Sequence, residues 1–111
     1  EILRRIDIPI AHLKHRFAFR QISLTPEGRS GVLVIGMINQ PSRLILTVTA
    51  ATRHPKQVEF STWPDDNTLT SKLTNEIPDH LYYDDIHGKP AWRKHMTGIF
   101  AKSICTELSN P

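Results

Sequence analysis

Two dense apolar runs near the middle of the chain dominate its hydrophobic pattern. They cover residues 32–38 and 44–48, and a turn-like sequence that contains Pro41 separates them. Runs of this length that are rich in Val, Ile and Thr predict neighbouring β-strands. The first run is apolar on both of its alternating faces, so we expect it to lie in the middle of a sheet that is covered on both sides.

A further strand is expected on each side of this central pair. Residues 19–24 show apolar and polar alternation, and Pro26 and Gly28 mark a turn between this strand and the next. Residues 56–63 alternate inward-facing apolar with outward-facing polar side chains, which is typical of an edge strand. Because the connections are short, the pattern predicts a four-stranded antiparallel meander in sequence order.

The N-terminal segment carries two competing patterns. Apolar residues recur at three- and four-residue steps over residues 3–17, as on an amphipathic helix, whereas the isoleucines of residues 6–10 alternate as in a strand. Pro9 is unsuited to a helix interior but fits a first turn. We therefore expect a helix that begins with Asp7 as its N-cap and runs to about Arg16.

A short helix and an irregular linker follow the predicted sheet. Asp66 or Asn67 can cap a helix that runs to about Ile77, where Pro78 stops it. Residues 78–89 contain no regular pattern but are too apolar to lie free in solvent. We expect this linker to pack across the sheet.

Pro90 opens the strongest helix of the chain, with its polar side formed by residues such as Arg93 and Lys94. Its apolar stripe comprises Trp92, Met96, Ile99, Phe100, Ile104 and Leu108. The whole pattern predicts a single α+β domain over residues 1–111. In this fold an N-terminal helix precedes a four-stranded antiparallel meander, and a short helix and a long amphipathic helix pack on one face of the sheet.

Composition is ordinary for a globular protein and excludes few functions. Apolar residues make up 39% and charged residues 23% of the 111 positions, and the net charge is +3, which is mild for a committed DNA-binding protein. No apolar run approaches the roughly 20 residues that span a bilayer, so we expect no membrane partner. The single cysteine, Cys105, has no internal disulfide partner, which favours an intracellular setting, cytoplasmic or nuclear.

Basic residues near the N-terminus and before the fourth strand suggest one function. The candidate phosphate contacts are Arg4, Arg5, Lys14, Arg16, Arg20, Arg53 and Lys56. Phe17 and Phe19 flank this set and are the aromatic side chains that a single-strand nucleic-acid binder would need for stacking. Because the chain has only four phenylalanines, we expect the core to require both of them. Nucleic-acid binding is therefore the alternative hypothesis, not the leading one.

Residues 79–89 gather most of the side chains that could perform catalysis. His80 and His87 lie there with Asp79, Asp84 and Asp85, which makes a small hydrolase a second alternative. Their spacing matches no metal-ligand motif, and a hydrogen-bonded linker accounts for them equally well. His12 and His15 are better explained as part of a polar surface, and Cys105 as a small apolar core residue. We assign no catalytic residue, metal ligand or cofactor.

The leading hypothesis is a non-enzymatic protein–protein interaction or assembly domain. It rests on the lack of any catalytic signature and on apolar side chains outside the predicted sheet. The candidate interaction residues are Leu81, Tyr82, Tyr83 and Ile86. The expected partner is another protein or a second copy of this chain.

Overall fold

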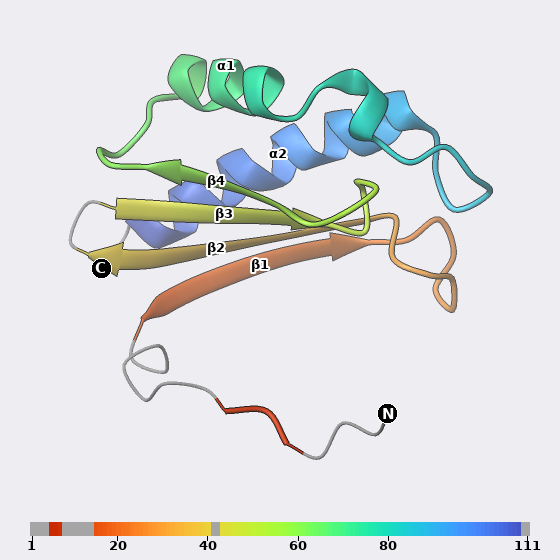
Figure 1. Cartoon of the computed structure of the whole chain (residues 1–111), viewed down its shortest axis with the longest axis horizontal. Coiled ribbons are helices and arrows are strands. Elements are labelled where there is room, and N and C mark those ends of the chain that lie inside the picture. Colours follow the sequence, from red (N-terminus) through yellow and green to blue (C-terminus); the bar gives the residue numbers. More distant parts are fainter. Residues whose placement is uncertain (1–4, 8–14, 41–42, 110–111) are drawn as a thin grey trace.

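A computed structural model describes residues 5–7, 15–40 and 43–109 of the chain. Four strands run in sequence order across one antiparallel sheet (Figure 1). They are β1 (Arg16–Ile22), β2 (Val32–Gln40), β3 (Arg43–Thr49) and β4 (Lys56–Phe60). The β-branched composition of the two central strands suits this half-buried pleated surface. The predicted four-stranded meander is confirmed.

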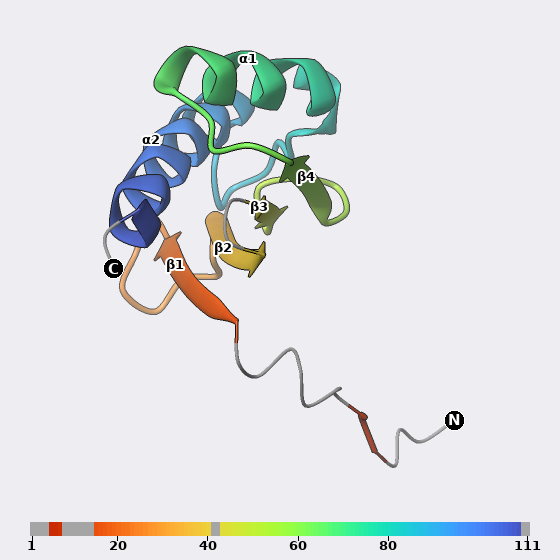
Figure 2. The same ribbon diagram turned by 90° about the vertical axis from the view of Figure 1, so that its left-hand side faces the viewer.

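Three helical elements follow the sheet: α1 (Asp66–Glu76), the short 3₁₀ helix η2 (Asp79–Leu81) and α2 (Pro90–Ser109). The carboxylate of Asp65 caps α1 by accepting a 2.7 Å hydrogen bond from the backbone N–H of Thr68, so the cap lies one residue before the predicted one. Both α1 and α2 lie on the same face of the sheet (Figure 2). Across the residues described, no helix combines the length and apolar character that crossing a membrane requires.

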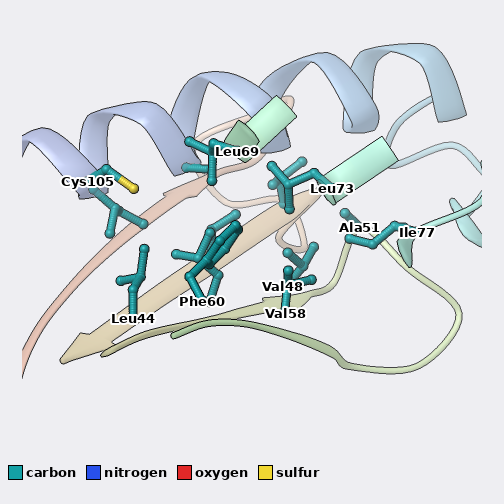
Figure 3. Close-up of a cluster of buried hydrophobic side chains, with 14 of the residues drawn as sticks. Leu44, Val48, Ala51, Val58, Phe60, Leu69, Leu73, Ile77 and Cys105 are labelled. Atoms are coloured by element: carbon teal, nitrogen blue, oxygen red, sulfur yellow. The ribbon is translucent and has the colours of Figure 1, made fainter. Parts of the chain in front are cut away.

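The hydrophobic core lies between this helix-covered face and the two helices. Leu44 and Val58 from the sheet meet Leu69 and Leu73 of α1, and Cys105 joins them from α2 (Figure 3). These side chains are buried, and burial of apolar surface supplies the main stabilisation of such a domain.

A row of small residues lets α2 approach the sheet closely. Ala18 on β1 lies opposite Gly36 on β2, and both face α2. A Cβ atom built on Gly36 would collide with Cγ2 of Ile104. The glycine therefore creates the room that the buried Ile104 occupies.

The predicted N-terminal helix is not supported. Asp7 lies in irregular, exposed chain, and β1 begins at Arg16, earlier than the predicted start of the first strand. The remainder of the expected helix, residues 8–14, lies outside the described residues. Phe17, Ala18 and Phe19 belong to β1, where side chains alternate between the two faces of the sheet. The three- and four-residue apolar spacing that predicts a helix therefore does not continue to Phe17.

The expectation that β2 is covered on both sides is also not supported by the described residues. α1 and α2 cover one face only, and no described element packs on the other (Figure 2). Phe17 and Phe19 lie on this second face and are 64% and 57% exposed, so the core does not contain them. The linker of residues 78–89 packs beside the end of β3: the backbone N–H of Tyr83 donates to the carbonyl of Ala51 at 2.9 Å.

Candidate functional site

The side of the sheet on which no described element packs, called the open face below, is continuous across all four strands. Its side chains are Phe17, Phe19, Gln21, Leu33, Ile35, Met37, Arg43, Ile45, Thr47, Thr49, Gln57 and Glu59. The strand register places Phe17 beside Met37 and Met37 beside Ile45 in one row across the sheet. In the next row Phe19 lies beside Ile35. Directly opposed side chains in such rows lie about 5 Å apart at Cβ, so these residues form one apolar patch.

Charge is sparse on the open face. Among its described side chains only Arg43 and Glu59 carry a formal charge, and they form an ion pair with each other. Gln57 donates a 3.4 Å hydrogen bond to Thr47, so part of the polar edge is also paired within the sheet. The open face therefore combines an apolar, partly aromatic patch with charges that are paired with each other. This is the composition of an interface core.

A buried arginine connects three loops at one end of the sheet. Arg93 in the first turns of α2 is only 2% exposed, although the helical pattern predicts it on the polar side. Its Nη1 donates to the carbonyls of Gly31 at 2.7 Å and Ala50 at 2.9 Å. Its Nε donates to the carbonyl of Gly88 at 3.0 Å. The loop before β2, the loop after β3 and the loop before α2 are therefore fixed by one side chain.

The same guanidinium forms an ion pair with Asp85, whose Oδ1 accepts from Nη2 at 2.6 Å. The backbone N–H of His87 donates to that oxygen at 2.8 Å. This backbone hydrogen bond first, with the charge of Arg93 adding to it, holds the pKa of Asp85 below its usual value. Ala50 has a φ of 64°, an uncommon conformation for a residue with a Cβ, and Arg93 binds its carbonyl.

A polar cavity of about 400 Å³ adjoins this cluster, with Arg29, Thr52 and Tyr83 among its lining residues. Four of the five N–H donors of Arg93 are satisfied by the protein itself, which is the arrangement of a structural clamp and not of a substrate-binding arginine. The Tyr83 ring adds packing, with the guanidinium carbons of Arg53 and Arg93 at 5.8 Å and 5.9 Å from its centroid.

Two carboxylates of residues 79–89 are paired with cations of α2, and Asp85 and His87 both line the polar cavity beside Arg93. Asp79 binds Lys94 at 2.7 Å, and Asp85 binds Arg93, so cations of α2 hold both carboxylates. The carbonyl of His80 accepts a 3.1 Å hydrogen bond from Arg53. Within the described part of the chain, no three His, Cys, Asp or Glu side chains are grouped so that they could hold a metal ion.

The described basic residues of the nucleic-acid hypothesis are not gathered on one surface. Arg16 and Arg20 turn toward the end of α2, where they donate to the carbonyl of Leu108 at 3.3 Å and to the carboxylate of Glu107 at 2.7 Å. Arg53 and Lys56 lie at the β4 side, the opposite edge of the sheet. Arg5 is exposed beside Asp7 at 3.5 Å, and Arg4 and Lys14 lie outside the described residues.

The residues first predicted as an interaction surface divide between core and solvent. Tyr82 is buried, and Leu81 is half-buried against the core. Burial, with the charge of Asp79 adding to it, raises the pKa of Tyr82 to about 12. Tyr83 is exposed, and Ile86 is 88% exposed at the tip of its loop.

Cys105 belongs to the core and not to a reactive site. Burial first, and the charge of Asp66 second, raises the pKa of its thiol to about 11. A thiol with a raised pKa carries little of the thiolate that acts as a nucleophile. The cysteine lies on α2 among the buried side chains of the core, as a small apolar side chain (Figure 3).

Two features of the site escaped the sequence reasoning, although the sequence holds a signal for each. Small residues at positions 18 and 36 mark the helix-facing side of their strands, which would have placed Phe17 and Phe19 on the open face. The buried side of α2 contains Ile104 and Leu108 of the predicted stripe, but in the first half of the helix it runs through Arg93, Thr97 and Ala101, one residue after the predicted Trp92, Met96 and Phe100.

Comparison with protein families, with curated proteins and with solved structures yields no match for this chain.

Proposed function

We propose that this chain is a non-enzymatic assembly domain that pairs with a second copy of itself through the open face. The observation that carries the proposal is the apolar patch centred on Phe17, Phe19, Ile35 and Met37, with both phenylalanines more than half exposed. Contiguous exposed apolar surface of this kind usually marks an interaction site.

The charge distribution favours a protein partner. Interface cores of proteins are depleted in charge and enriched in aromatic residues and Met, as the open face is. A nucleic-acid site requires cations that reach phosphates, and the described arginines nearest the phenylalanines, Arg16 and Arg20, turn to the other side of the sheet.

Size and neutrality favour a second copy as that partner. Four strands about 4.8 Å apart and seven residues of about 3.4 Å each give a face of about 450 Å² in projection. Side-chain relief makes the accessible area larger, which brings it near the ~800 Å² that each partner buries in a standard interface. Two such faces would stack about 10 Å apart as in a β-sandwich, and the paired Arg43 and Glu59 would leave no unmatched charge.

The hydrophobic gain is of the size that a dimer needs. With about 200 Å² per phenylalanine, the exposed fractions of Phe17 and Phe19 amount to about 240 Å² in each copy. Burying this area in both copies contributes about 12 kcal/mol at about 25 cal/mol per Å². The loss of translational and rotational freedom on association costs an estimated 4–15 kcal/mol, so the net gain from the phenylalanines is at most about 8 kcal/mol and supports a dimer no tighter than about micromolar.

Sedimentation velocity over a concentration series tests the proposal. The parent should shift from monomer to dimer with concentration, and the double variant Phe17→Ser, Phe19→Ser should remain monomeric with little change in its melting temperature. Ile86→Ser is the matched control because it removes an exposed apolar side chain outside the open face and should leave the dimer intact. A parent that stays monomeric to about 0.1 mM, or a double variant that dimerises like the parent, would refute the proposal.

One observation keeps the nucleic-acid alternative in the test. Phe17 and Phe19 lie on the same side of β1 and are exposed, as bases stacking on a sheet would require. Fluorescence anisotropy with single-stranded DNA and RNA at about 0.15 M salt distinguishes the two functions. Micromolar binding by a monomeric parent that the double variant loses would replace the assembly function with this alternative, whereas weak binding that disappears at this salt supports assembly.

A further inference from the structure

A second surface lies on the helical side of the molecule, away from the open face. It is a groove of about 680 Å³ between α1, η2 and the outer side of α2. Residues from all three elements line it, including Thr70, Asp79 and Gly98. Because both helices separate it from the open face, an occupant here would not compete with the proposed dimer (Figure 2).

Gly98 has no side chain and so leaves an opening in the wall of the groove, in the middle of α2. A Cβ atom at this position would meet nothing within 4 Å, so no packing requirement accounts for the glycine. Glycine inside a helix costs about 0.5–1 kcal/mol relative to alanine. The glycine of β2, Gly36, has a packing reason in Ile104, and Gly98 has none within the described residues. An incoming side chain would supply one.

Cations flank this opening along one stripe of the helix. Lys94, Gly98 and Lys102 follow one another at four-residue steps, which places each lysine about 6 Å along the axis from the glycine. Lys94 pairs with the largely exposed Asp79, and such surface pairs exchange at little cost. For Lys102 no ion pair is found among the described residues. Ile99 is 45% exposed beside the stripe and adds an apolar contact.

We infer that this groove binds an acidic segment of a partner protein, with an apolar side chain seated over Gly98 and a carboxylate toward each lysine. The two lysines favour a negatively charged ligand. The space over Gly98 and the exposed Ile99 favour an apolar side chain in its centre. The two lysines are about 12 Å apart along the axis, a span that two turns of a helix match with acidic residues at i and i+8. A groove open along a helix suits a peptide segment, because helix-in-groove docking uses such spaced anchors.

Two defined peptides test the inference. One is a helix-forming peptide of about twelve residues with Glu, Leu and Glu at four-residue steps, and the other has Gln in place of both Glu. We expect the acidic peptide to bind the parent about fivefold more tightly, as two exposed ion pairs would give. Lys102→Glu should abolish this preference, and Lys89→Glu, an equal charge change at an exposed site outside the groove, should preserve it.

A second pair of variants tests the opening itself. Gly98→Leu fills the groove with a good helix former and meets no neighbour at its Cβ, so the fold should be retained while both peptides bind at least about tenfold more weakly. Thr106→Leu places the same side chain on α2 outside the groove and should bind as the parent does. Absence of binding to either peptide, equal affinity for both, or undiminished binding by Gly98→Leu would overturn the inference.

Discussion

Replacing the buried Arg93 with methionine should destabilise the protein strongly without altering the open face. Methionine retains the length and apolar stem of arginine but offers no donor. The carbonyls of Gly31, Ala50 and Gly88 would then lose their Arg93 hydrogen bonds in a buried setting, and Asp85 would lose its counter-ion. Removal of one partner leaves the full desolvation cost of the other, which is larger than the net value of the bond.

The size of the effect follows from these contacts. Hydrogen bonds to a charged group contribute about 1.5–3 kcal/mol each, and Arg93 donates three of them to backbone carbonyls of this cluster. The energies of these contacts are not additive, because they share one side chain. The carboxylate of Asp85 is 43% exposed, so solvent compensates part of the loss of its ion pair. We therefore expect a decrease of about 4 kcal/mol in the free energy of unfolding, a large part of the 5–15 kcal/mol typical of a domain.

Urea unfolding, followed by fluorescence of Trp63 and Trp92, measures this change. With a slope of about 2 kcal/mol per M, the midpoint of Arg93→Met should fall by about 2 M. Lys94→Met is the control, because it removes a neighbouring cation with a surface ion pair and should cost less than about 1 kcal/mol. Arg93→Lys should lie between the two, since one ammonium group cannot reach all four acceptors. A midpoint for Arg93→Met within about 0.3 M of the parent would show that Arg93 is not a clamp.

Three further outcomes are expected from the same unfolding assay. Gly36→Ala should lose about 1–3 kcal/mol by colliding with Ile104, whereas Gly98→Ala should gain up to about 1 kcal/mol, and equal signs would contradict this assignment. The pKa of Tyr82 is about 12 in the folded protein and about 10 when unfolded, so the unfolded chain releases this proton first as pH rises. The free energy of unfolding should therefore fall between pH 10 and 12, and it should fall more in the parent than in Tyr82→Phe. The lowered pKa of Asp85 implies the opposite direction: its contribution is present above about pH 4 and is lost as pH falls through the folded pKa, so the parent and Asp85→Asn should converge in acid.

The strands and helices were predictable because their signals are local. The Val- and Ile-rich runs, the turn at Pro26 and Gly28, and the caps near Asp66 and Pro90 act over a few residues each. Such signals place elements along the chain and give their order. They do not specify which face of the sheet the helices cover. The strand β2 is apolar on both faces, so the helices could pack on either one.

The wrong expectation for the phenylalanines has a specific physical reason. It treats large apolar residues as the ones that must be buried, and because aromatic residues are scarce it assigns Phe17 and Phe19 to the core. A helix, however, approaches a sheet most closely where side chains are small, and the row of Ala18 and Gly36 meets that condition. The larger residues of the same strands are then directed outward by the two-residue period.

The buried arginine shows the same limit on the helix side. A charged residue is assigned to the polar face of α2 because isolated burial of a charge is costly, and the stripe is then chosen one residue away. That cost disappears when the donors have partners. Gly88 and Asp85 lie 5 and 8 residues before Arg93, but the carbonyls of Ala50 and Gly31 are 43 and 62 residues distant in sequence. No local pattern contains them. The clamp fixes the loops at one end of the sheet, whereas the two formal charges of the open face, Arg43 and Glu59, are paired with each other.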